Sequence, residues 1–230
     1  MQGPLMQNFG DVQTQARMSN HGSKMVKVMM APGQDLLAKS GSMIAYEGLI
    51  DFVPNPPRLQ NIAKSWATGE GVSLMQCQGQ GELFLADYGA DCIVMQLSGD
   101  GLSVNGPNIL AFDAGLSWDI KPIKGLGKLA GGGMFNVVVQ GQGWIAITTR
   151  GTPIMLDCGQ QPTYVDRDAL VAWTTGLDIG LNKSVSLKPS RKALKQARSG
   201  EAAQLAFKGQ GFVVVQPAED PPGKLFSIKG

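Results

Sequence analysis

Histidine and cysteine, which supply many nucleophilic and metal-dependent active sites, are scarce in this sequence of 230 residues. The single histidine, His21, stands in a polar N-terminal segment, whereas a metal site or a Ser-His-Asp triad needs histidine inside the fold. The three cysteines, Cys77, Cys92 and Cys158, have neither metal-ligand spacing nor a histidine base beside them. We therefore expect buried structural thiols, no metal, no cofactor and no catalytic residue.

Glu70 and Glu201 are candidates for a catalytic carboxylate pair, because each follows a glycine at the same place in a recurring pattern. Two carboxyl groups can act as acid and base when they lie ~5 to 10 Å apart. Equivalent residues of a threefold repeat are held apart, so the pattern favours charges at turns or helix ends. A hydrolase using Glu70 and Glu201 is the weakest of the functional hypotheses.

The stretch from Gly125 to Ala130 fits the dinucleotide-binding pattern G-x-G-x-x-A. That pattern needs a strand before it, a helix after it and an acidic residue ~20 positions further on. This chain has Arg150 near that distance, and the surrounding pattern indicates antiparallel strands. The sequence therefore disfavours nucleotide binding.

Five basic residues occur without an acidic residue among them in a segment predicted to be helical: Lys188, Arg191, Lys192, Lys195 and Arg198. On a helix, Arg191, Lys195 and Arg198 share one face. Two interpretations stay open: a solvated face, or a binding surface for acidic lipid, nucleic acid or an acidic protein. No aromatic residue is interleaved with the basic ones, which disfavours single-stranded nucleic acid.

The anion-binding hypothesis predicts that replacing Arg191, Lys195 and Arg198 by glutamine weakens binding to anionic liposomes or polyanions and leaves the fold intact. Affinity of the unmodified protein should also fall as salt rises. Liposome co-sedimentation and a melting curve measure the two effects. If the unmodified protein ignores liposomes and nucleic acid at low salt, the five residues form only a solvated face.

The elements that carry these residues recur three times, over Gly69–Ala86, Gly131–Thr149 and Gly200–Val215. Each copy has a glycine-rich start, about six strand-forming residues, Gly-Gln-Gly and an apolar run. The runs are short and rich in valine, isoleucine and aromatic residues, which predicts strands. We expect each Gly-Gln-Gly to turn a hairpin.

A second recurring half precedes each copy and ends in two apolar residues, an alanine and an aromatic residue. On this alignment Ala45, Ala111 and Ala172 correspond, and we expect each to face tightly packed backbone. Between the halves lie proline-initiated segments that predict short helices: Pro57–Ala67, Pro122–Ala130 and Pro189–Arg198.

These patterns predict a single domain over residues 1–230, with internal repeats at about 26–88, 93–150 and 154–217. The fold class is all-β: three pseudo-repeats of antiparallel β-sandwich type around a pseudo-threefold axis, with short connecting helices. A hydrophobic content of 43% supports a sizeable core, and 31 glycines indicate many tight turns. Residues 1–24 are expected to form an arm or an edge strand.

Composition and charge limit the compartments and partners that the sequence predicts. A net charge of +2 creates no global field for nucleic acid or an acidic membrane. The N-terminus lacks the features of a signal peptide, and no stretch approaches ~18 apolar residues. The odd number of cysteines favours a reducing compartment, so we expect a cytoplasmic protein.

With the repeats in place, the sequence resembles the altered inheritance of mitochondria family. The matching features are Pro32-Gly33 followed by Ser40–Ala45, then Thr68-Gly69-Glu70 leading to Gly79-Gln80-Gly81, and their recurrence over about residues 25–217. The resemblance implies three β-repeats, similar in topology to the tryptophan RNA-binding attenuation protein, and no established enzymatic activity. The chain departs from the pattern at Gly131-Gly132, where Gly-Glu is expected.

Together these observations predict a non-enzymatic β-repeat scaffold or binding protein. Its expected partner is a protein or an anionic surface, which it can reach through the basic helix, or a second copy of the chain, which it can reach through edge strands. The alternative is a small-ligand or carbohydrate-binding module that uses loop carboxamides and aromatic residues at the lobe ends: Tyr46, Trp66, Trp118 and Trp173.

Overall fold

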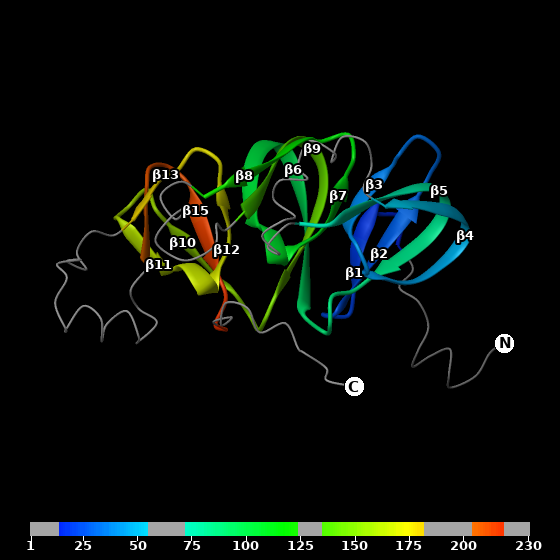
Figure 1. The fold of residues 1–230 in the computed structure, drawn as a ribbon, viewed down its shortest axis with the longest axis horizontal. Coiled ribbons are helices and arrows are strands. Elements are labelled where there is room, and N and C mark those ends of the chain that lie inside the picture. Colours follow the sequence, from blue (N-terminus) through cyan, green and yellow to red (C-terminus); the bar gives the residue numbers. More distant parts are fainter. Residues whose placement is uncertain (1–13, 55–71, 124–134, 182–203, 219–230) are drawn as a thin grey trace.

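The computed structural model describes residues 14–54, 72–123, 135–181 and 204–218. The fold is all-β, and every strand pair of the described residues is antiparallel, as the alternating and apolar runs predict. Figure 1 shows the strands in three groups along the long axis, which we call the first, second and third lobes. Among the described residues the only helical elements are two short 3₁₀ turns, η2 (Gly106–Asn108) and η3 (Arg167–Ala169).

The first lobe contains β1 (Met18–His21), β2 (Met25–Met30), β3 (Leu36–Lys39), β4 (Met43–Pro54) and β5 (Leu74–Leu85). The second contains β6 (Asp91–Asn105), β7 (Ile109–Asp113), β8 (Ser117–Pro122) and β9 (Phe135–Thr149). The third contains β10 (Ile154–Asp157), β11 (Thr163–Asp166), β12 (Leu170–Thr174), β13 (Asp178–Leu181), β14 (Gln204–Lys208) and β15 (Phe212–Val215).

One large sheet runs through all three lobes in the order β1-β2-β5-β3-β7-β9-β6-β12-β15-β10, with β4 added to β5 and β8 added to β9. The pair β3·β7 joins the first lobe to the second, and the pair β6·β12 joins the second to the third. A smaller sheet, β11-β14-β13, completes the third lobe. Of the two alternatives for residues 1–24, an arm or an edge strand, the described part fits the second: β1 lies at one end of the large sheet and pairs there with β2.

Each lobe has its own group of buried apolar side chains, and these groups meet at the lobe junctions. Ala38 of β3 pairs with Ala111 of β7 at the first junction, and Ala172 of β12 pairs with Val104 of β6 at the second. All three alanines are fully buried. Small side chains therefore lie where strands of neighbouring lobes meet in the interior.

Two predicted positions need correction. Ala45 is exposed, because it follows an irregularity in the pairing of β4, which is an edge strand of the described sheet. Pro122 does not begin a helix: it is the last residue of β8, where it pairs with Phe135 of β9. A proline at a strand end lacks only an N–H that the ladder does not need there. Of the other helix predictions, 57–67, 124–130 and 189–198 lie outside the described residues.

The Gly-Gln-Gly motifs do not turn hairpins in the first two lobes; instead they bend a continuous strand. In β5, residues on one side of Gly79–Gly81 pair with β3, and residues on the other side pair with β2. In β9 the pairing changes from β8 to β7 across Gly141–Gly143. In the third lobe Gly209–Gly211 separates β14 in the small sheet from β15 in the large one. Each motif is thus a corner where the chain changes partner strands.

Glycine is required at the first corner because the backbones of β4 and β5 approach each other closely there. Gly79 and Gly81 have φ values of +127° and +146°, which L side chains rarely adopt. A Cβ atom on Gly81 would lie 1.9 Å from the carbonyl oxygen of Glu47, and one on Gly79 would lie 2.1 Å from that of Leu49. Neither obstacle is a side chain that can rotate away.

We expect Gly81→Ala to destabilise the protein more than Gly99→Ala. Gly99 also has a positive φ, +104°, but a Cβ atom there meets nothing within 4 Å. The control should cost about 1–2 kcal/mol for the backbone conformation, and Gly81→Ala about 1–3 kcal/mol more for the clash. Urea unfolding of both variants measures the difference, and equal losses would show that the close approach is unimportant.

Candidate functional site

Several residues singled out from the sequence lie outside the described residues. These are the five basic residues of the predicted helix (Lys188, Arg191, Lys192, Lys195 and Arg198), the two glutamates and one aromatic residue (Glu70, Glu201 and Trp66). Their roles stay predictions. The other three aromatic residues proposed for ligand binding are described, and they do not form one surface.

Those three aromatic residues differ in exposure. Tyr46 is exposed on β4, whereas Trp118 on β8 is half-buried and meets Phe112 edge-on, with ring centroids 5.8 Å apart. Trp173 is buried in the third lobe against Phe207, at 6.0 Å between centroids. Trp173 is therefore a core residue, and the expectation that it contacts a ligand is wrong. Trp173 ends the apolar run Leu170–Trp173, and such a run is typical of core residues.

The most apolar exposed surface of the described residues lies along β4. Of nine exposed large hydrophobic side chains in the described part, this strand carries five: Met43, Ile44, Tyr46, Leu49 and Val53. Leu49 is 85% exposed and Ile44 is 50% exposed. Contiguous exposed apolar side chains on one element mark interaction surfaces more often than isolated ones do.

β4 is held in place from one side only. It pairs with β5 along its whole length, from Met43 opposite Leu85 to Pro54 opposite Met75, and with no other strand in the described part of the chain. Ile50 is buried, and the half-buried Phe52 packs on the same core group. Tyr46 contacts Phe52 edge-on at 5.3 Å between centroids. Alternate residues therefore anchor the strand, while its other face and its free edge are presented outward.

The outward face of β4 is acidic. Glu47, Leu49 and Asp51 alternate along the strand and so share this face. Glu47 lies directly opposite Glu82 of β5, whose carboxylate is 3.0 Å from the Lys27 ammonium. Neither Glu47 nor Asp51 forms an ion pair with any other described residue. We use the name β4 edge for the exposed apolar residues of β4, which lie on both faces of the strand, together with Glu47 and Asp51.

A cleft of about 380 Å³ at the junction of the first two lobes is the main alternative site. Arg17 lines it and donates through Nη2 to the carbonyl oxygen of Gln34 at 2.7 Å, and through Nη1 to that of Met29. Its Nε lies 3.3 Å from Oδ1 of Asp113, whose other oxygen accepts from the Trp144 amide at 2.8 Å. These polar groups bind one another. We therefore interpret the cleft as a structural junction between the two lobes.

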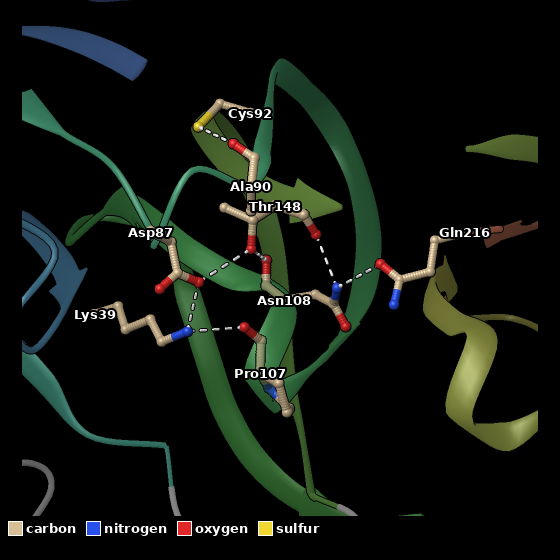
Figure 2. A network of polar contacts seen from close by, with 8 residues as sticks. All are labelled: Lys39, Asp87, Ala90, Cys92, Pro107, Asn108, Thr148 and Gln216. Carbon is tan, nitrogen blue, oxygen red and sulfur yellow. Dashed lines mark hydrogen bonds and ion pairs between the residues drawn. The ribbon is translucent and has the colours of Figure 1, made fainter. Parts of the chain in front are cut away.

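A second polar network, shown in Figure 2, links the three lobes. Lys39 donates to Asp87 at 2.7 Å and to the carbonyl oxygen of Pro107 at 3.0 Å. Asn108 donates to the carbonyl oxygen of Thr148 at 2.8 Å and lies 3.4 Å from Oε1 of Gln216. Most of these polar atoms have protein partners, as buried polar groups require. The network therefore holds strands of the three lobes together, which is a structural role.

Comparison with protein families matches residues 16–218 to the family described as mitochondrial biogenesis AIM24. The chain belongs to this family. The match spans all three lobes, and it confirms the resemblance drawn from the recurring glycine motifs. No curated protein matched the chain.

Among solved structures, the crystal structure of protein SPYM3_0169 from Streptococcus pyogenes is similar to this AIM24-family chain. The TM-score is 0.69 at 20% sequence identity, over 88% of this chain and 92% of that chain. At this identity the likeness shows the fold alone. The all-β architecture is therefore shared with an experimental structure over nearly its whole length.

The thiols of this family member are buried and free. Burial raises the pKa of the Cys77 thiol to about 12 and, together with the carboxylates of Asp87 and Asp91, that of Cys92 to about 11. His21 is half-buried on β1, with its ring edge-on to Phe84 at 6.4 Å. Among the described residues no group of three or more His, Cys, Asp or Glu side chains is placed to hold a metal ion. The same residues include no helix with the length and apolarity needed to cross a bilayer.

These pKa directions predict inert thiols in the folded protein. Only the thiolate is a good nucleophile, and at pH 7.5 Cys77 and Cys92 are almost entirely protonated as well as buried. We expect a thiol-specific chromogenic disulfide to label the native chain slowly and to label all three cysteines rapidly after unfolding in guanidinium. A fast-reacting equivalent at either cysteine in the native protein would contradict the structural role.

Proposed function

We propose that this member of the AIM24 family is a non-enzymatic scaffold in the cytoplasm that binds a macromolecular partner, or a second copy of itself, through the β4 edge. The observation that carries the proposal is a twelve-residue strand paired on one side only within the described chain, with five exposed apolar side chains. Soluble proteins normally shorten, charge or cover such edges, because an open edge pairs with other chains.

The energetics favour occupation of the β4 edge by another chain. Fully burying a large apolar side chain contributes about 1.5–3 kcal/mol. The five on β4 are between 36% and 85% exposed, so each can contribute a corresponding fraction of that free energy. An incoming strand adds main-chain hydrogen bonds along the open edge. Ordering and docking costs offset part of this gain, so the surface suits a partner that meets several of the side chains together.

The proposal includes a scaffold of three equivalent repeats, at about 26–88, 93–150 and 154–217, in one domain around a pseudo-threefold axis. Support comes from β3, β7 and β12, each of which carries a fully buried alanine as its third residue: Ala38, Ala111 and Ala172. The first glycines of the three Gly-Gln-Gly motifs have similar φ values, +127°, +124° and +114°. A similar conformation at the first glycine of each motif is what repetition of a folded unit would produce.

The small-ligand or carbohydrate-binding alternative has less support. It relies on exposed aromatic residues near unengaged polar groups. Trp173 is buried, and the Arg17 and Asp113 groups of the cleft at the first lobe junction bind one another. The buried, free thiols support a reducing compartment, in line with a cytoplasmic location.

A charge on the β4 edge tests the proposed function. Leu49→Lys should leave the unfolding free energy within about 0.5 kcal/mol, because the side chain is 85% exposed, and should abolish association at this edge. The matched control is Tyr164→Lys in the third lobe, where the side chain is 52% exposed.

Two readouts are needed for this test. Light scattering at high micromolar concentration reports self-association, and a photo-reactive amino acid at Val53 reports which proteins of the source cell contact the edge. We expect Leu49→Lys, but not Tyr164→Lys, to lower the molar mass or to remove the cross-links. If neither readout depends on Leu49, the proposed function is wrong.

A further inference from the structure

We propose that the natural occupant of the β4 edge is an extended segment of a partner protein in which basic residues flank apolar ones, added to β4 as a further strand. The proposal rests on the proposed function and names the chemistry of the partner. Three features of the β4 edge carry it: the free strand edge, the two carboxylates that form no ion pair with a described residue, and the exposed apolar side chains on the same strand.

The free edge sets the conformation of the occupant. Within the described chain β4 pairs only with β5, so the backbone groups along its other edge are open to an added strand. A segment that pairs there must be extended, and its side chains must alternate between the two faces of the sheet. A helix could not use these main-chain groups.

The carboxylates set the charge of the occupant. Glu47 faces Glu82 across the β4·β5 pair, and like charges directly opposite each other destabilise a sheet. Lys27 lies 3.0 Å from Glu82 and compensates that carboxylate, whereas Glu47 and Asp51 have no ion-pair partner among the described residues. A cationic side chain opposite Glu47, and another opposite Asp51, would complete the charges on this face.

The spacing sets the pattern of the occupant. Residues opposite Glu47, Leu49 and Asp51 share one face, so they should be basic, apolar and basic. The two residues between them point to the other face, beside the exposed Tyr46, and should also be apolar. The expected motif is therefore a basic residue, three apolar residues and a second basic residue.

The same charges disfavour a second copy as the occupant. Two β4 strands paired about Leu49 would set Glu47 of each copy opposite Asp51 of the other. Strand β10, at the other end of the large sheet, exposes Ile154 and Met155 but is only four residues long and ends in Asp157. Neither strand of this chain supplies the cations that Glu47 and Asp51 lack.

Synthetic nine-residue peptides with Lys-Val-Leu-Val-Lys at the centre, capped by Gly and Ser at each end, test the inference on the full chain. One control peptide replaces both lysines by glutamate, and a second carries an N-methyl group on the leucine, which removes a main-chain donor. Binding is measured by titration with amide chemical-shift mapping. We expect the lysine peptide to bind, with shifts confined to residues 43–54 and the neighbouring strand β5, and both controls to bind at least 10-fold more weakly.

Protein variants then distinguish the contribution of the two carboxylates to binding from non-specific apolar association. Glu47→Gln with Asp51→Gln should weaken binding of the lysine peptide roughly 3- to 10-fold, as expected for two partly exposed ion pairs, and remove most of its salt dependence. The matched control removes two carboxylates elsewhere, Asp100→Asn with Asp119→Asn, and should leave the affinity unchanged.

Distinct results would overturn the inference. Equal binding of the glutamate peptide, shifts away from β4, or no binding of the lysine peptide would each show that a basic strand is not the occupant. If the unmodified protein is oligomeric and Leu49→Lys makes it monomeric, a second copy occupies the edge. In any of these cases the dependence of cross-links or molar mass on Leu49 would still decide the proposed function separately.

Discussion

The structure depends on strands that bend sharply enough to serve two sets of partners. Strand β5 pairs with β2 at one end, with β3 at the other and with β4 along its length. The bend is possible because Gly79 and Gly81 have no Cβ atoms and adopt positive φ values next to the β4 backbone. In the third lobe Gly209 and Gly211 lie between β14 and β15, which belong to different sheets.

Much of this architecture follows from the sequence, because strand periodicity and glycine placement are local properties. The all-β class, most strand positions and the three copies of the glycine motif can be read without coordinates. The role of Gly-Gln-Gly as a corner cannot be predicted from the sequence, because a glycine that bends a strand and a glycine that ends one give the same pattern. Only the pairing partners on each side of Gly79–Gly81 distinguish the two cases.

Lys39 conceals the buried alanine of the first lobe from the sequence pattern. The third strand residue is alanine in β3, β7 and β12, but the next residue is Lys39 in the first lobe and an aromatic residue in the others, Phe112 and Trp173. A search for an apolar ending therefore passes over Ala38 and stops at Ala45. The substitution is tolerated because the Lys39 ammonium reaches Asp87 and the carbonyl oxygen of Pro107 (Figure 2), which satisfies the charge.

The candidate site on β4 could not be predicted from the sequence either, because it too depends on which strands are neighbours. Apolar residues from Met43 to Val53 suit a buried strand as well as an exposed one, and exposure depends on which strands lie alongside. Glu47 and Asp51 then have two consequences at once. Charges on an open edge oppose uncontrolled pairing between identical copies, which is how β-proteins avoid aggregation. The same charges are left uncompensated until a cationic strand arrives, so one pair of carboxylates can both exclude the wrong partner and select the right one.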